Sequence, residues 1–331
     1  PKPTYAQIAA QAGVGTATVE RVLNGRGGVR PETAARVVAA AVALDWPGRL
    51  PARHRGILRI EVILVRPESS FDARLARAFR RIAASLDAAV QVHVTFVDEA
   101  DSAAIAQRIR SPEPPRAGLV IAAPDSAAVR AALEEARADG LPVVQVVTRI
   151  IDGAAFVGID NYAAGRMAAM MVSRMSGARG AVMALCHSAA YEVQRGRVQG
   201  FTDYLAEHPS PHLRFVFTAF GHDDRGQSAQ RLREALREWP DLAAVYNAGG
   251  GNTSVLRLME RHGRHIFFVG HELTDLSAAA LKSGAADVVL DQVPEAQARR
   301  AIDLLLSRLG LIDDPVDNPP IRFTTITAEN V

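Results

Sequence analysis

Three short groups of side chains have the residue types needed for covalent or metal chemistry. Cys186 precedes His187, but a nucleophile and its base meet through folded geometry, so adjacency in sequence predicts only a buried cysteine at a strand end. Residues 222–224 (His-Asp-Asp) and 271–272 (His-Glu) carry potential metal ligands without the spacing of a zinc site. The sequence shows no Gly-x-Ser-x-Gly elbow and no dinucleotide fingerprint after its first long strand. We therefore expect no enzymatic activity, no cofactor and no metal site.

Polar side chains just past predicted strands are better candidates for a binding site. Asp160 and Asn161 precede a helix predicted to begin near residue 163, and composition alone favours an ordinary N-cap there. Asn247 follows another strand, and residues 248–252 (Ala-Gly-Gly-Gly-Asn) open a helix with amides that could cradle a phosphate. Because the run lacks the full phosphate-loop pattern and its lysine, it does not by itself predict a phosphate site.

The elements that would position these residues begin at residue 57. Apolar strand candidates alternate with helical patterns at the spacing of repeated βα units, which predicts parallel sheets covered on both faces. The predicted strands cover residues 57–65, 90–97, 118–122, 142–147, 180–185, 213–218, 242–247, 265–269 and 286–290. Polar residues past the ends of such strands meet along one edge of a sheet, which is where α/β proteins bind ligands.

The first 45 residues have the pattern of a helix-turn-helix. An apolar helical stripe ends at Gly15, where two helices would have to turn sharply. The second helix, over residues 16–24, would bury its valines and leucine and leave its other positions free for base edges. A third helix begins at Pro31 with Glu32 in its first turn and runs to residue 44. A three-helix bundle that binds protein, or nothing, is the alternative.

Charge is unevenly distributed along the chain. Residues 1–56 contain eight basic and three acidic residues, and the remainder contains 30 basic and 33 acidic ones. The positive head agrees with a DNA-binding module. The 331 residues, 48% of them hydrophobic, exceed one ordinary domain and supply ample core. With one cysteine, no signal-peptide pattern and no long uncharged apolar run, we expect a cytoplasmic protein without disulfides.

The helix-turn-helix resembles that of the LacI/GalR (lactose-repressor) family of bacterial transcription regulators. The resemblance extends over nearly the whole chain. The matching residues are Ile8, Ala9, Ala12, Gly13, Val14, Thr18, Val19, Arg21, Val22, Leu23, Asn24, Val29, Thr33, Val37, Leu44 and Pro47. The resemblance implies a helix-turn-helix head over residues 1–46 and a hinge over 47–56. It also implies a two-lobe, type I periplasmic-binding-protein-like α/β sensor over 57–331. Lobe 1 would comprise residues 57–159 and 292–320, and lobe 2 residues 160–291 and 321–331.

The resemblance also implies which residues of the head meet DNA. Thr16, Ala17 and Arg21 would read bases in the major groove, with Arg21 the strongest candidate for a bidentate contact to guanine. The residues implied at phosphates are Thr4, Gly15, Thr18, Asn24 and Val29.

Two residues of the head depart from the family pattern. Gly15 and Glu20 each replace a serine common in the family, and Gly15 brings no hydroxyl to a phosphate. A carboxylate at Glu20 would repel phosphate or accept a hydrogen bond from a cytosine amine, which predicts an unusual operator sequence.

The linker departs from the family as well. Relatives place a hinge helix there, with a leucine that wedges into the minor groove, but Pro51 would interrupt such a helix. Leu50 is the available substitute for the wedge, and Arg49, with two further arginines, would form a basic strap for the phosphates.

In the sensor, the resemblance implies a ligand cleft between the lobes, which the chain crosses near residues 158–162, 291–294 and 320. The implied ligand residues are Asp160, Arg197, Asn247, Glu272 (usually aspartate in the family) and Gln292, with Phe71 and Tyr191 as aromatic walls that are also explained by ordinary packing. Such carboxylates, amides and one guanidinium suit a neutral polyol, a sugar or sugar alcohol. Sugar acids and phosphosugars stay open if Arg66 or Arg149 points inward.

These features predict a homodimer that places two recognition helices on palindromic operator DNA, with DNA affinity set by a small-molecule effector. Repression relieved by the ligand is the expected sign, and co-repression stays open. A sugar-binding protein without DNA regulation, and a DNA-binding protein whose sensor serves only for dimerisation, are the alternatives. Residues 322–331 show no heptad pattern, so we expect no terminal coiled coil.

Overall fold

The computed structural model describes residues 3–24, 26, 28–44, 46, 57–177, 179–186, 192–221, 225–250, 252–312 and 314–331. Its first three helices are α1 (Tyr5–Ala12), α2 (Thr16–Leu23) and α3 (Pro31–Ala43). The side chain of Thr4 caps α1 in a reciprocal capping box with Gln7, and Gly13 ends that helix with a φ of 65°. These local signals set the turn between α1 and α2.

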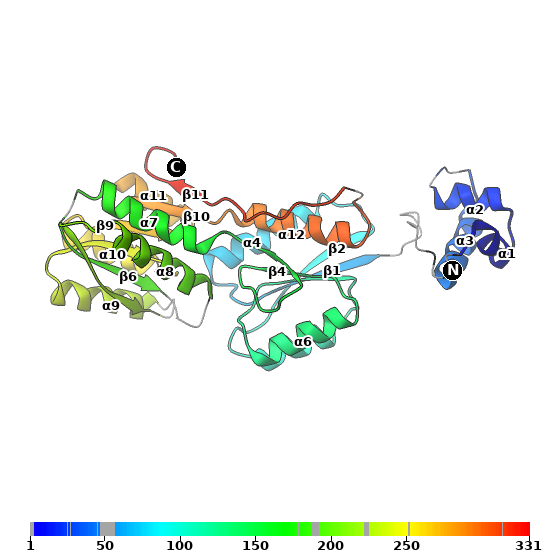
Figure 1. The fold of residues 1–331 in the computed structure, drawn as a ribbon, viewed down its shortest axis with the longest axis horizontal. Helices are drawn as coiled ribbons and strands as arrows, with labels where there is room; N and C mark the ends of the chain where they lie inside the picture. Colours follow the sequence, from blue (N-terminus) through cyan, green and yellow to red (C-terminus); the bar gives the residue numbers. More distant parts are fainter. Residues whose placement is uncertain are drawn as a thin grey trace.

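The three helices form a unit with its own core. Ile8, Val19 and Val37, one from each helix, are fully buried in a single apolar cluster. Figure 1 shows this unit at one end of the long axis, and the two sheets occupy the rest of the molecule. The predicted hinge over residues 47–56, with Arg49, Leu50 and Pro51, lies outside the described residues.

The first sheet has five parallel strands in the order β2-β1-β3-β4-β5. The strands are β1 (Leu58–Leu64), β2 (Val90–Phe96), β3 (Gly118–Ile121), β4 (Val143–Val146) and β5 (Ala155–Val157). The intervening helices are α4 (Ser70–Ala83), α5 (Ser102–Arg110) and α6 (Ala127–Ala138). Successive β1 side chains alternate between faces: Val62 joins the core under α4, and Ile63 joins the core under α5 and α6.

The second sheet has six strands in the order β11-β10-β9-β8-β6-β7, and only β11 is antiparallel to its neighbour. The strands are β6 (Gly180–Cys186), β7 (Leu213–Phe220), β8 (Leu242–Asn247), β9 (Phe267–His271), β10 (Val288–Asp291) and β11 (Thr324–Ile326). Its helices are α7 (Asn161–Met175), α8 (Glu192–Glu207), α9 (Arg225–Glu238), α10 (Asn252–His262) and α11 (Asp275–Ser283). Buried side chains of α7 and α8 pack on one face and those of α9, α10 and α11 on the other.

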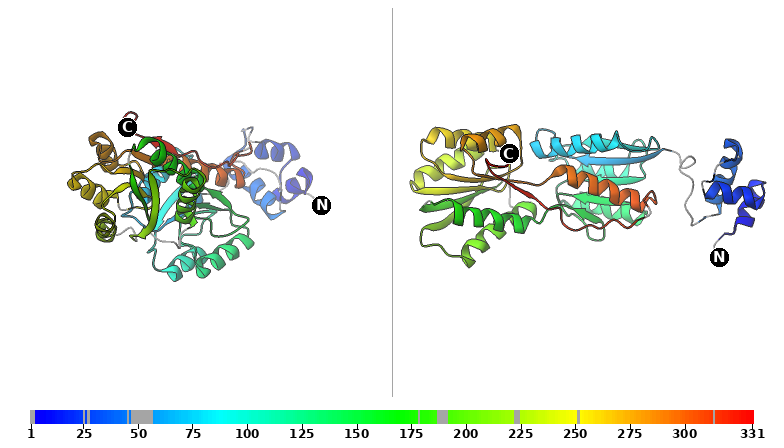
Figure 2. Two further views of the ribbon diagram at one scale, coloured as in Figure 1. Left: turned by 60° about the vertical axis from the view of Figure 1, so that its left-hand side comes forward. Right: turned by 90° about the horizontal axis from the view of Figure 1, so that it is seen from above.

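The chain passes between the two sheets three times. It leaves the first sheet after β5, returns after β10 to form α12 (Pro294–Arg308), and leaves again before β11. Leu305 of α12 packs so closely on Gly118 of β3 that a Cβ at that glycine would lie 3.3 Å from its side chain, so α12 belongs to the first lobe although it follows the second in sequence. The first and third passages lie side by side, since Ile159 bridges Ile321. Figure 2 shows α12 beside the first lobe and the terminal segment returning to the second.

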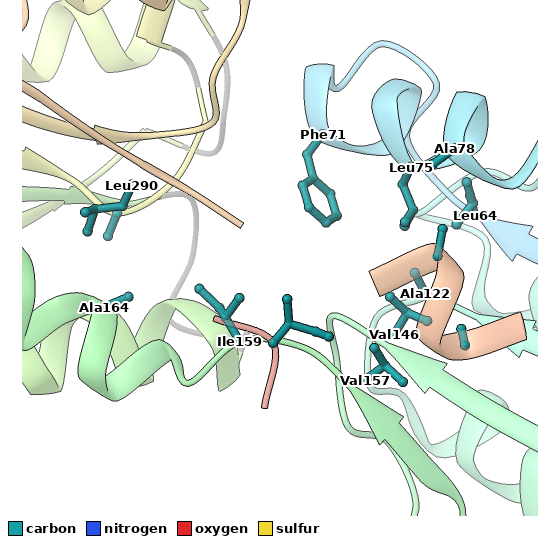
Figure 3. Packing of buried hydrophobic residues seen from close by; sticks show 14 of the residues in the cluster. Leu64, Phe71, Leu75, Ala78, Ala122, Val146, Val157, Ile159, Ala164 and Leu290 are labelled. Carbon is teal, nitrogen blue, oxygen red and sulfur yellow. The ribbon is translucent and has the colours of Figure 1, made fainter. Parts of the chain in front are cut away.

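One buried apolar cluster runs through both lobes. It includes Phe71 and Leu75 of α4, Ile159 of the first passage, and Ala164 and Leu290 of the second lobe (Figure 3). Burial of this kind is the dominant favourable term in folding. The passages between the lobes are therefore part of the core.

The two-lobe α/β fold with parallel sheets and a helical head is confirmed, and each of the nine predicted strands overlaps a strand of the structure. The strands β5 and β11 were not predicted, since each has three residues and neither shows a period.

Candidate functional site

The exposed face of α2 carries the residues predicted to read bases. Thr16, Ala17 and Arg21 are exposed, and Val19 and Val22 hold the opposite side of the helix in the core. One side of a short helix is thus free to enter a major groove.

Of the residues predicted at phosphates, Thr4, Gly15 and Asn24 are exposed, and Thr18 and Val29 are half-buried. Gly15 caps α2 without a side-chain hydrogen bond, as its lack of a hydroxyl predicts. Arg49 and Leu50 lie outside the described residues.

Glu20 is neutralised within the head. Its Oε1 accepts a hydrogen bond from Nη1 of Arg26 at 3.2 Å, in an exposed ion pair. The carboxylate that departs from the family pattern thus has a cation beside it, which weakens its repulsion of phosphate.

A cavity lies between the two lobes, where the carboxyl ends of strands from both sheets meet. The first lobe lines it with the start of α4 and with the segments that follow β1, β3 and β4. The second lobe lines it with the start of α8, with Gly249 and Gly250 before α10, and with the end of β9. Four of the predicted ligand residues, Phe71, Arg197, Glu272 and Gln292, line this cavity.

Arg197 is held in place by two acceptors. It is 4% exposed, its Nε donates to Oδ1 of Asn161 at 2.8 Å, and its Nη1 donates to the carbonyl of Ala248 at 2.8 Å. These bonds fix a buried guanidinium between the start of α7 and the end of β8, so it presents a charged fork with little conformational freedom.

Glu272 is buried with only part of its carboxylate satisfied. Oε1 accepts from Nε2 of Gln292, whereas Oε2 has no hydrogen-bond partner among the described residues and lies 3.9 Å from Nη1 of Arg74. Burial, aided by the negative charge of Asp291, raises the pKa of Glu272 to about 7. At neutral pH the carboxyl group is therefore poised to accept or to donate a hydrogen bond.

Asp160 and Asn247 are placed differently from the other predicted ligand residues. Asp160 is the N-cap of α7, with Oδ1 accepting from the amide of Ala163 at 2.8 Å, and it lines a separate cavity beside Asn161 and Arg149. Asn247 is fully buried, and its Nδ2 donates to Oδ1 of Asn252 at 2.6 Å. Neither residue lines the described part of the central cavity, although Nδ2 of Asn247 also donates to the carbonyl of Gly250, which does. Tyr191 lies outside the described residues.

The cavity also contains charged and polar residues beyond the predicted ligand set. Arg66 lines the cavity, so one of the two arginines considered as an inward-pointing cation of the first lobe is at the site. Asp72, Glu99 and Gln194 line the cavity as well. Asp72 looks in sequence like an ordinary acidic residue of a helix's first turn. Its place at the start of the helix that follows the first strand was the available signal.

Residues with strained backbone conformations lie around the central cavity. The described non-glycine residues with positive φ are Val147 (69°), Glu272 (73°) and Val293 (52°), and each follows the end of a strand at the cavity or the second passage. A positive φ in a β-branched residue is rare, and strained backbone clusters at functional sites.

The residues considered for covalent and metal chemistry are described only in part. Cys186 is buried at the end of β6, and His187 and residues 222–224 lie outside the described part of the chain. His271 accepts from or donates to the hydroxyl of Tyr246 at 2.9 Å, and burial lowers its pKa well below the usual value. Within the described ranges, no group of three potential ligands could hold a metal ion.

Two family models match the chain. Residues 4–46 match the model described as bacterial regulatory proteins, lacI family, and residues 60–310 match a periplasmic binding protein domain. The chain belongs to the LacI/GalR family of regulators. The resemblance inferred from the helix-turn-helix is confirmed, and a family of regulators, not of enzymes, accounts for both parts of the chain. Among the described residues, no helix is long and apolar enough to cross a membrane.

Solved structures similar to this family member match its sensor. A solute-binding protein from Burkholderia graminis in complex with D-arabinose is 18% identical, with a TM-score of 0.75 over 83% of this chain and 96% of that one. A glucose-galactose binding protein from Geobacillus stearothermophilus is 18% identical, with a TM-score of 0.73 over 84% and 99%. A solute-binding protein from Agrobacterium vitis bound with α-D-tagatopyranose is 21% identical, with a TM-score of 0.71 over 82% and 95%. These likenesses show the fold, and the comparison with curated proteins gave no match.

Proposed function

We propose that the protein is a transcriptional repressor whose affinity for operator DNA is set by a small polyhydroxylated ligand, a sugar or sugar alcohol, bound between its lobes. The observation that carries this proposal is the presence, in one chain, of a lacI-family head with an exposed recognition face and of a two-lobe sensor with a buried polar cavity. A head without a sensor would bind DNA constitutively, and a sensor without a head would have no output.

In this mechanism a homodimer sets two α2 helices in successive major grooves of a palindromic site. Ligand binding in the cavity changes the closure of the lobes, and with it the spacing of the two heads. By linkage, the ligand weakens operator binding by the same factor by which the operator weakens ligand binding.

The polar groups of the cavity support a hydroxylated ligand. Arg197 and Gln194 donate hydrogen bonds, Glu272 and Asp72 accept them, and Phe71 supplies an apolar face. The structurally similar proteins were solved with D-arabinose and tagatopyranose, and the fold that they share supports a ligand of the same class here.

The test is retention of genomic DNA. The purified full chain is incubated with sheared DNA from its source at moderate salt, which suppresses non-specific phosphate binding, and the retained fragments are sequenced. We expect one or a few palindromic sites, released by a sugar of the pathway encoded beside them. Retention without sequence preference, in the absence and presence of pooled sugars and polyols, would reject the proposal.

The second candidate is a sugar-binding protein without DNA regulation, which the similarity of the sensor to solute-binding proteins favours. It predicts ligand binding by the full chain with no enriched DNA sequence. The lacI-family match of residues 4–46 argues against it.

A further inference from the structure

The central cavity has more acidic than basic side chains. Among the described residues, the charged ones that line it are Arg66, Asp72, Glu99, Arg197 and Glu272. Two cations thus face three carboxyl groups. His271, which also lines the cavity, adds no charge at neutral pH because burial lowers its pKa.

Within the described ranges, the carboxyl group of Asp72, in the first lobe, lacks a close cation or donor for one of its oxygens. Asp72 is 4% exposed, and its Oδ2 has no hydrogen-bond partner among the described residues. Arg66 is the nearest cation, but its Nε lies 3.7 Å from this oxygen and 3.8 Å from Oε1 of Glu99. One guanidinium therefore serves two carboxylates at distances beyond a normal hydrogen bond.

The second lobe presents a matching group. Glu272 is 8% exposed, and its Oε2 also has no hydrogen-bond partner in the described structure. Arg74 lies 3.9 Å away, but its N–H groups donate to Asp291, Glu295 and the carbonyl of Leu273. Two buried carboxyl groups, one from each lobe, thus line the same cavity, and each has one oxygen without a donor among the described residues. Buried carboxylates in this state are costly unless a ligand supplies donors or charge.

We propose that the ligand is an amino sugar or amino alditol, whose ammonium group binds the carboxylates of Asp72 and Glu272. This inference rests on the ligand site of the proposed function and goes beyond it by naming the charge of the ligand. An ammonium group brings three donors and one positive charge, so it supplies both the donors and the opposite charge that the two carboxyl groups lack. Hydroxyls of a neutral sugar supply donors but leave the charge, and an acidic ligand adds to it.

Burial makes the charged form of both carboxyl groups costly, which favours a cationic ligand beside them. It raises the pKa of Asp72 and that of Glu272, in agreement with the unpartnered oxygen that each carboxyl group has. A cationic ligand would lower both values on binding, so its affinity rises with pH until its own amine loses its proton. The other charged groups that act on this pair are Arg66, Glu68 and Glu99 beside Asp72, and Arg74, Arg197 and Asp291 beside Glu272.

The test is calorimetry on the full chain with matched ligands. The amines are D-glucosamine, D-galactosamine, D-mannosamine and D-glucamine, each compared with its N-acetyl derivative and with the parent hexose or alditol. We expect at least one amine to bind at least about tenfold more tightly than both of its uncharged counterparts. Binding of an uncharged sugar or a hexose phosphate as tightly as the best amine, or of no amine at all, would overturn the inference.

Variants locate the binding. Asp72→Asn and Glu272→Gln keep the shape of each side chain and remove its charge, so each should lose about tenfold or more of the amine's advantage over the uncharged counterpart. Glu134→Gln, on the exposed side of α6, is the control and should keep that advantage. The comparison of amine with neutral ligand within each variant separates lost recognition from general misfolding. An advantage retained in both cavity variants would place the ammonium elsewhere and reject the proposal.

The DNA-retention experiment distinguishes this inference from the proposed function. If an operator is found and is released only by a neutral sugar, the regulator stands and the ammonium site fails. If amines bind through Asp72 and Glu272 but no operator is enriched, the ligand inference stands and the regulator fails.

Discussion

Nη1 of Arg74, on α4, lies 2.6 Å from Oδ1 of Asp291, the last residue of β10. The same guanidinium donates to Glu295, in the first turn of α12, and to the carbonyl of Leu273, which follows Glu272. One side chain of the first lobe thus forms hydrogen bonds with the second lobe and with the passage between the lobes, next to the cavity. Nη1 of Arg74 also lies 3.9 Å from Oε2 of Glu272, so this contact between the lobes adjoins the predicted ligand site.

Arg74→Ala should lower the free energy of unfolding by about 3–5 kcal/mol, because it leaves the buried carboxylate of Asp291 without its cation. Urea unfolding of the full chain measures the effect. Arg77→Ala, an exposed position on the same helix, is the control and should change stability by less than about 0.5 kcal/mol. Similar losses in both variants would mean that the Arg74 contact contributes little.

Arg197→Ala should abolish the response of DNA binding to the ligand and leave operator affinity unchanged, since the side chain anchors the cavity far from the head. Fluorescence anisotropy of labelled operator, with and without ligand, measures both quantities. Arg195→Ala changes an exposed arginine of the same helix and should retain the response. A full response in Arg197→Ala would remove this residue from the ligand site.

Arg21→Ala should lower discrimination between operator and a singly mismatched site by roughly 1–3 kcal/mol, the size of one bidentate base contact. Competition binding with each base pair substituted in turn measures the loss and locates it. Arg36→Ala, on the exposed side of α3, removes an equal charge and should preserve base preference. Equal discrimination in the Arg21 variant and the native protein would reject the base-reading role.

Glu272 should make stability fall as pH rises. Its pKa is about 7 in the folded protein against 4.5 for the unconstrained group, so the folded state holds the proton more tightly. The resulting stabilisation is complete below about pH 4.5 and is lost as pH rises to about 7, an effect of up to about 3 kcal/mol.

The measurement is urea unfolding of the native protein and of Glu272→Gln at pH 5 and pH 8. The native protein should lose stability relative to the variant between these values. Asp72, Asp287 and Asp303, whose pKa values are also raised, are common to both proteins and cancel in the difference. A stability difference that is the same at both pH values would show that Glu272 titrates normally.

Gly165→Ala should destabilise the sensor, because a Cβ on α7 would overlap the carbonyl oxygen of Arg197 on α8. Relief requires the two helices to separate, which costs about 1–3 kcal/mol or more and displaces the Arg197 backbone. Thermal unfolding and ligand titration together check this prediction. Gly177→Ala is the control. Beyond its chain neighbours, no atom of the described residues lies within 4 Å of the Cβ position at Gly177, so this variant measures the strain of a positive φ without any steric overlap.

The sequence predicted what local patterns encode and missed what only the assembled lobes create. Gly15 and Pro31 mark helix boundaries of the head locally, so its three helices could be placed in advance. The strand β11 has three residues and exists because the third passage carries it to the edge of β10. No local pattern encodes that pairing.

The residues of the cavity also divide into those that could be found from the sequence and those that depend on the assembled structure. Arg197, Glu272 and Gln292 were found because the family resemblance marks their positions. Asp72 was missed because its burial and its place in the cavity depend on how α4 packs in the assembled structure. Asn247 has the composition of a ligand residue, but its amide is used within the turn before α10.

The threefold passage between the lobes sets an order of events during synthesis on the ribosome. The head, residues 5–43, is local in sequence and can fold as soon as it emerges. The first lobe cannot be completed when its own strands have been made, since α12 arrives only after the whole of α7 to β10. A nascent chain would therefore display a finished DNA-reading unit before it possesses a sensor to restrain it.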